Sequence, residues 1–137
     1  MALFYNKTER ANPLKRGEPK KWYITLKPLG IIREREVAKA MADETTLNPK
    51  EAEMTLYQAE KVIASKLLDG HTVELGELGA FRLTVSSKGA DKKEDVTAQN
   101  VTKVNVRFIP SKSFRELINK ATFSPVSSLS NDKKDGE

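Results

Sequence analysis

The sequence predicts an α+β domain that completes its core by forming a dimer. We expect two helices, an antiparallel β-sheet with a projecting arm, and a short C-terminal helix. Apolar residues recur at helical spacing over residues 33–67, and from residue 73 they alternate with polar residues, as in strands with one buried face. Hydrophobic residues make up 38% of the chain. That fraction supplies a modest core, which proteins of this kind often complete by dimerising.

Two extra strands are expected ahead of this domain. Residues 2–8 and 21–27 are rich in strand-forming residues. The stretch between them contains two prolines and a glycine, which are typical of a loop, and several basic residues. We therefore expect residues 1–30 to form an N-terminal β extension with a basic loop.

Local signals define two helices. The first is predicted over residues 33–43. The second begins at Asn48, whose side chain can accept from a free N–H group, with Pro49 in the first turn and Glu51 completing a capping box. Gly70 is placed to end this helix in a left-handed conformation. The apolar stripe of the second helix consists of Ala52, Leu56, Ala59, Ile63 and Leu67.

The apolar period becomes two after Gly70. Val73 and Leu75 predict a first strand, residues 76–79 predict a turn, and residues 80–85 predict a second strand. Because polar and apolar residues alternate in both segments, we expect an antiparallel pair with one face buried.

A polar stretch separates this pair from the last strand. Residues 86–102 are predicted to form an exposed arm, with a short turn of helix between 95 and 101. Residues 103–109 predict the last strand. Its apolar face is formed by Val104, Val106 and Phe108, and its polar face by Lys103, Asn105 and Arg107.

A short helix is predicted to close the domain over residues 113–121, with Ser113 and Glu116 forming a capping box. From residue 124 onward, small and polar residues dominate, and we expect the tail, residues 124–137, to be disordered. The expected organisation is therefore the β extension, a main domain over residues 31–123, and the tail.

Charge is distributed unevenly along the chain. The formal net charge is +5, made up of +5 for residues 1–30, −4 for residues 31–81, +5 for residues 82–123 and −1 for the tail. Such asymmetry indicates a polyanionic partner for the basic segments, with the acidic middle facing away from it. Chance clustering on a basic protein is the alternative.

Two blocks of the sequence resemble the HU / integration host factor family of bacterial histone-like DNA-binding proteins. Residues 70–83, GHTVELGELGAFRL, are similar to the family pattern G-D-x-V-x-L-x-G-F-G-x-F-x-V. Residues 108–117, FIPSKSFREL, resemble the family block F-x-x-G-x-x-L-K. With the two helices upstream, the resemblance covers residues 33–121, and the N-terminal strands are similar to those of the extended HU-like proteins of Bacteroidetes. It implies an HU-like fold and an intertwined dimer that binds duplex DNA.

The chain departs from the family pattern at several positions. Leu78 stands where the family usually has Phe, and Ser111 replaces a usual Gly. In the family, the arm carries R-N-P-x-T-G, whose proline wedges between base steps and kinks the duplex. Residues 86–102 contain no proline. The sequence therefore supports DNA binding and leaves bending or compaction open.

The candidate DNA-binding residues lie in the second half of the chain. By the resemblance, Lys112 and Arg115 match basic positions at the start of the last helix, and Arg82 matches a basic strand position. The others follow the arm and its last strand: Lys88, Lys92, Lys93, Lys103 and Arg107. Such side chains contact phosphates and carry little sequence information, so we expect little base readout. A solvated helix face or a solubilising loop is the alternative interpretation.

Two interpretations of the β extension remain open. Its basic residues either add a second DNA contact or protect an edge strand. These residues are Arg10, Lys15, Arg16, Lys20 and Lys21. Trp22 and Tyr23 either fill a face of the sheet or stack on unpaired bases of RNA or single-stranded DNA.

Composition argues against several other classes of protein. The chain has no cysteine, and we interpret its one histidine, His71, as a turn residue. No nucleophile, metal cluster or phosphate loop accompanies its carboxylates, so we expect no enzyme, no metal, no cofactor and no small-molecule substrate. It lacks a membrane-length apolar run and a signal-peptide pattern. We expect a cytoplasmic homodimer of the nucleoid that binds double-stranded DNA. A protein-interaction or structural module on the same fold is the alternative.

Overall fold

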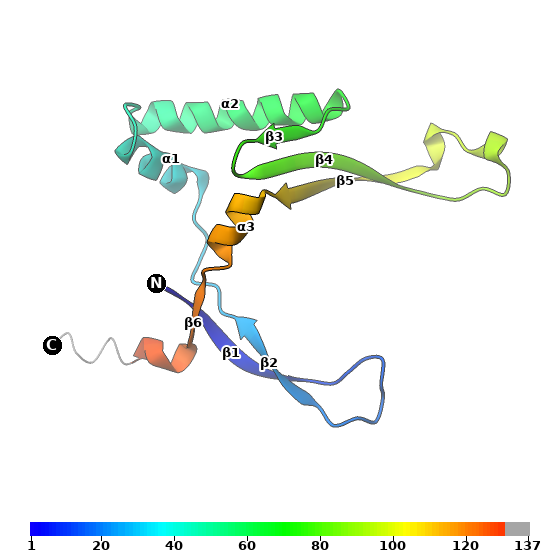
Figure 1. The fold of residues 1–137 in the computed structure, drawn as a ribbon. Helices are drawn as coiled ribbons and strands as arrows, with labels where there is room; N and C mark the ends of the chain where they lie inside the picture. Colours follow the sequence, from blue (N-terminus) through cyan, green and yellow to red (C-terminus); the bar gives the residue numbers. More distant parts are fainter. Residues whose placement is uncertain (131–137) are drawn as a thin grey trace. The chain divides into compact units, whose positions relative to one another are not determined.

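The structure is a computed structural model that describes residues 1–130, and its chain divides into two compact units (Figure 1). The central unit is Ile32–Leu117, and the terminal unit joins Met1–Ile31 to the chain from Ile118 onward. Within the described residues, no helix is long and apolar enough to cross a membrane.

The central unit begins with two helices, α1 (Glu34–Asp43) and α2 (Pro49–Leu68). The predicted capping box is confirmed, because the Glu51 N–H donates to Asn48 Oδ1 at 2.9 Å and the Asn48 N–H donates to Glu51 Oε2 at 3.1 Å. At the other end Gly70 has a φ of 91°, so α2 ends where the sequence predicts.

A three-stranded antiparallel sheet follows in the order β3-β4-β5. Its strands are β3 (Val73–Leu75), β4 (Gly79–Ser87) and β5 (Val101–Pro110). Gly79 has a φ of 144° and lies against β5, where an added Cβ would stand 2.9 Å from Pro110 Cα and closer still to the Ile109 carbonyl oxygen. This glycine lets β5 approach the start of β4 closely.

Strands β4 and β5 extend beyond the predicted bounds and carry the arm outward, as Figure 1 shows. The arm tip comprises residues 88–100 and contains two short 3₁₀ helices, Lys93–Asp95 and Ala98–Asn100. The second of these helices lies within the predicted turn. The tip is closed at its base, because the Lys88 N–H donates to the Asn100 carbonyl at 2.8 Å and Asn100 Nδ2 donates back to the Lys88 carbonyl at 3.2 Å.

The last helix of this region, α3 (Lys112–Ile118), starts earlier than predicted and ends earlier. The predicted cap at Ser113 is wrong, because Ser111 Oγ accepts from the Phe114 N–H at 3.1 Å. Ser111 Oγ also donates to the Glu77 carbonyl in the β3–β4 turn. The serine that replaces the family glycine therefore caps α3 and ties it to the sheet.

Very little of the central unit is buried. Ala38, Ala52 and Leu67 are its only buried apolar side chains, and all three lie on α1 and α2. Along the predicted stripe of α2, Leu56 and Ile63 are half-buried and Ala59 is exposed. A single copy of the chain therefore leaves the inner surface of the unit partly uncovered.

The terminal unit is a sheet in the order β2-β1-β6, made of β1 (Ala2–Arg10), β2 (Lys21–Leu26) and β6 (Thr122–Pro125). Strand β6 pairs in parallel with β1, and Thr122 Oγ1 donates to the Met1 carbonyl at 3.0 Å. A 3₁₀ helix, Val126–Ser130, follows. The predicted domain end at 123 and the predicted disorder from residue 124 are therefore wrong up to residue 130. The remainder of the predicted tail, residues 131–137, lies outside the described residues.

Candidate nucleic-acid interface

The β4–β5 ladder has one polar face and one apolar face, because side chains alternate along each strand. On the polar face, Arg82 lies opposite Arg107, Thr84 opposite Asn105 and Ser86 opposite Lys103. The apolar face comprises Phe81, Leu83, Val85, Val104, Val106 and Phe108. Three of the eight predicted site residues therefore share one exposed surface.

Arg82 and Arg107 form a cross-strand pair of like charges. Direct cross-strand partners have their Cβ atoms about 5 Å apart, a spacing at which like charges destabilise the sheet. Both side chains are exposed, and no carboxylate among residues 1–130 forms an ion pair with either. The fold thus presents two guanidinium groups side by side without a counter-ion from the described chain.

Lys103 extends this surface toward the arm. It lies four positions before Arg107 in β5, which corresponds to about 14 Å along an antiparallel strand. Between them, Asn105 Nδ2 donates to Ser86 Oγ at 3.1 Å, which holds polar groups of both strands on the same face. We call Arg82, Lys103 and Arg107 the strand cluster.

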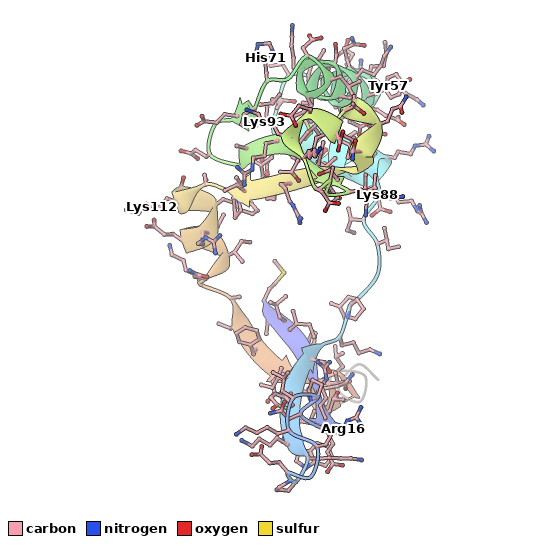
Figure 2. All side chains as sticks on the ribbon, turned by 90° about the vertical axis from the view of Figure 1, so that its right-hand side faces the viewer. Arg16, Tyr57, His71, Lys88, Lys93 and Lys112 are labelled. Carbon is pink, nitrogen blue, oxygen red and sulfur yellow. The ribbon has the colours of Figure 1, made fainter. Side chains whose placement is uncertain are left out.

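The arm tip is electrically balanced. Its three lysines, Lys88, Lys92 and Lys93, are matched by Asp91, Glu94 and Asp95. Figure 2 labels Lys88 and Lys93, and both are exposed. The tip places cations at the end of the ladder but contributes no net charge.

Lys112 and Arg115 lie on α3, beyond the end of β5 at the foot of the arm (Figures 1 and 2). Lys112 is the first residue of the helix, Arg115 lies one turn later, and both are exposed. They form a second basic group, separate in the fold from the arm tip.

The opposite charge gathers on the helices. Desolvation of its carboxyl, then the charge of Glu60 and a hydrogen bond with that side chain, and then the charge of Glu53 raise the pKa of Glu34 above its ordinary value. Glu34 lies on α1, and Glu53 and Glu60 lie on α2. This acidic cluster repels phosphates, which agrees with the predicted division between a basic sheet and acidic helices.

Comparison with known proteins identifies the family of this chain. Residues 1–125 match the HU-HIG family, described as an HU domain fused to wHTH, Ig, or glycine-rich motif. The chain belongs to this family. The predicted resemblance to HU proteins is thereby confirmed, and the match includes the N-terminal strands, so these strands are part of the HU-HIG pattern.

Solved structures agree with this assignment. A Bacteroides vulgatus protein described as DNA-binding aligns with a TM-score of 0.64 at 17% identity, over 91% of this chain and 48% of its own. Our chain therefore spans about half the length of that protein. The HU protein in an Anabaena HU–DNA cocrystal aligns with a TM-score of 0.52 at 20% identity, over 65% of this chain and 99% of its own. Among curated proteins, none matches the sequence.

The sequence predicted Arg82 and Arg107 of this HU-HIG chain as separate candidate residues. It did not predict that they lie directly opposite each other. Alternation of polar and apolar residues predicted that Arg107 lies on a polar face, and the family pattern singled out Arg82. Their pairing depends on the register of β4 and β5, which the length of the arm determines. No local signal in the sequence reports that register.

Proposed function

We propose that this protein is a histone-like protein of the nucleoid that binds duplex DNA as a homodimer, largely without sequence specificity, through phosphate contacts. The pair Arg82–Arg107 is the observation that carries the proposal. A like-charge pair on an exposed face costs stability unless an anion neutralises it. Guanidinium groups recognise phosphate oxygens well, because they present several N–H donors in a planar fork.

The family and the fold of its relatives support the same partner. The Anabaena HU protein was crystallised with DNA, and the Bacteroides protein is described as DNA-binding. We assign the contact surface to the strand cluster together with Lys112 and Arg115, and we include Lys88, Lys92 and Lys93 as weaker contacts at the balanced tip. Phosphates occur at every base step, so such contacts position DNA without reading its sequence.

We infer that the second copy of the chain covers the apolar face of the ladder. Val85 and Val106 on this face are 60% and 64% exposed, although the opposite face is polar. The rings of Phe81 and Phe108 lie 5.0 Å apart between centroids with their planes tilted by 38°, and Phe108 meets Phe114 edge-on at 6.4 Å. An exposed apolar surface of this kind is typical of a protein–protein interface. Dimerisation also brings two strand clusters to one duplex.

Binding of a short duplex measured by fluorescence anisotropy over a salt series tests the proposal. The logarithm of affinity falls with the logarithm of salt concentration with a slope of about −0.9 for each phosphate neutralised. The double variant Arg82→Gln/Arg107→Gln is expected to make this slope shallower by about 1.8 per protomer. The matched control Lys39→Gln/Lys61→Gln removes the same charge from the helices and is expected to leave the slope unchanged. No binding at low salt, or equal slopes for both variants, would contradict the proposal.

A protein-interaction or structural module is the second candidate, because the balanced arm tip lacks the proline wedge of the family. Reversal of Lys112 and Arg115 to Glu separates the candidates. Loss of duplex binding on this reversal supports the DNA contact that we propose for α3. Binding that survives excludes α3 from the contact surface, and a wild-type chain that ignores DNA favours the interaction module.

A further inference from the structure

The terminal unit is the more basic of the two units. Residues 1–31 and 118–130 carry eight basic and two acidic residues, whereas residues 32–117 carry fourteen of each. The central unit therefore has no net charge, and its basic surface exists only because basic and acidic residues lie on different elements. The terminal unit has a net charge of +6 over its described residues, which makes it the larger source of attraction for a polyanion.

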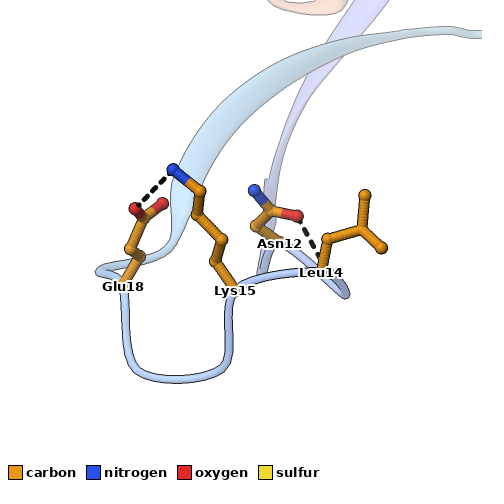
Figure 3. A network of polar contacts seen from close by, with 4 residues as sticks. All are labelled: Asn12, Leu14, Lys15 and Glu18. Atoms are coloured by element: carbon orange, nitrogen blue, oxygen red, sulfur yellow. Dashed lines mark hydrogen bonds and ion pairs between the residues drawn. The ribbon is translucent and has the colours of Figure 1, made fainter.

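This charge is concentrated at one end of the β1–β2 hairpin. The hairpin end, residues 10–21, carries five basic residues and one acid. The acid, Glu18, forms an ion pair with Lys15 at 3.2 Å and so neutralises that lysine (Figure 3). Four exposed cations remain, and none has an ion-pair partner among residues 1–130. We call them the hairpin cluster: Arg10, Arg16, Lys20 and Lys21.

The hairpin cluster repeats the arrangement that marks the strand cluster. Arg10 and Lys21 are direct cross-strand partners in the β1–β2 ladder, so two like charges again face each other without a counter-ion. This pair, like the other, costs stability in the absence of an anion. Beside it lies a hollow of about 370 Å³ lined in part by Arg10, Asn12 and Tyr23. A phosphodiester group that enters this hollow meets a guanidinium group.

Polar contacts hold the hairpin loop in shape. Asn12 Oδ1 accepts from the Leu14 N–H at 3.0 Å, as Figure 3 shows. The Asn12 carbonyl accepts from the Lys15 N–H at 3.3 Å, and the Lys15–Glu18 ion pair closes the next turn. The loop is therefore organised before any partner binds, which lowers the entropic cost of binding.

We propose that the hairpin cluster is a second phosphate-binding surface for duplex DNA, which supplies the positive charge that the balanced arm tip lacks. The proposal rests on DNA binding by the central unit. Only residues 27–33 and 119–121 connect the elements of the two units, so a duplex bound by one unit is held near the other at high effective concentration. This tethering favours duplex DNA over an unrelated acidic partner.

The full-length variant Arg10→Gln/Arg16→Gln/Lys20→Gln/Lys21→Gln tests the proposal. All four positions are exposed, so the fold is expected to persist, which far-UV circular dichroism checks. The salt slope for duplex binding is expected to become shallower by up to about 3.6 per protomer. The control Lys39→Gln/Lys50→Gln/Lys61→Gln/Lys66→Gln removes the same charge from the helical region and is expected to preserve the wild-type slope.

The outcomes separate this proposal from the proposed function. A wild-type chain that fails to bind duplex overturns both. Wild-type binding with a steep slope that the hairpin variant retains overturns only the hairpin proposal. A hairpin variant that keeps the wild-type slope on duplex but no longer binds polyglutamate assigns the cluster to an acidic polypeptide and likewise overturns it. If the hairpin variant and its control lose the same amount of slope, the effect comes from net charge and not from the hairpin surface, and the hairpin proposal is again overturned.

Discussion

Replacement of Gly79 by alanine is expected to destabilise the central unit strongly. The residue has a φ of 144°, and its Cβ would fall 2.9 Å from Pro110 Cα and nearer still to the Ile109 carbonyl oxygen. A left-handed conformation costs an L-residue about 1–2 kcal/mol, and overpacking against a rigid neighbour costs about 1–3 kcal/mol more. Both neighbours are backbone atoms of β5, so the clash cannot be relieved by rotating a side chain. The expected loss is therefore about 2–5 kcal/mol.

Urea unfolding followed by circular dichroism measures this loss. With a slope on the order of 2 kcal/mol per molar urea, the midpoint is expected to fall by about 1–2.5 M. Protein concentration must be equal in all samples, because association shifts apparent stability. Gly89→Ala is the matched control, since nothing lies within 4 Å of the added Cβ in the arm tip. A midpoint for Gly79→Ala that equals that of Gly89→Ala would refute the close approach of β4 and β5 at this residue.

Two further predictions concern the cap of α3 and the acidic helices. Ser111→Ala is expected to lower the free energy of unfolding by about 1–2 kcal/mol, because it removes the cap on the Phe114 N–H. Ser113→Ala is expected to cost less. The reverse order of the two variants in thermal unfolding would contradict the capping assignment. Glu34→Gln is expected to stabilise the fold at neutral pH. The raised pKa means that the charged carboxylate is disfavoured in the folded state, so the cost is present above the folded pKa and disappears as pH falls through it. A gain of equal size in unfolding experiments at neutral and acidic pH would contradict this reasoning.

The helices were predictable from the sequence because their signals are local. Asn48, Glu51 and Gly70 lie within the helix ends that they cap, and each acts through neighbours in the chain. The cap of α3 was predicted wrongly at Ser113, because Ser111, two residues earlier, accepts from the Phe114 N–H instead. The contact of Ser111 with the distant Glu77 carbonyl accompanies the observed cap, and no local pattern reports that contact.

Long-range pairing accounts for most of what the sequence did not predict. Strand β6 is four residues long and contains a serine and a proline, so its own composition does not indicate a strand. Its partner β1 is about 120 residues away, and the parallel register Ala2↔Thr122 has no local signature. The register that sets Arg82 opposite Arg107 across the arm is hidden in the same way. Alternation along a strand predicts its faces but not its partner.

The parallel pairing of β1 with β6 has a consequence for how the chain is made. Because β1 and β2 precede β6 in the chain, the hairpin has its β1 edge unpaired while residues 27–121 are synthesised. An open edge is a template for pairing with another chain. The net positive charge of the hairpin keeps nascent copies apart during that interval. Strand β6 therefore also covers an edge that would otherwise pair with a neighbouring chain.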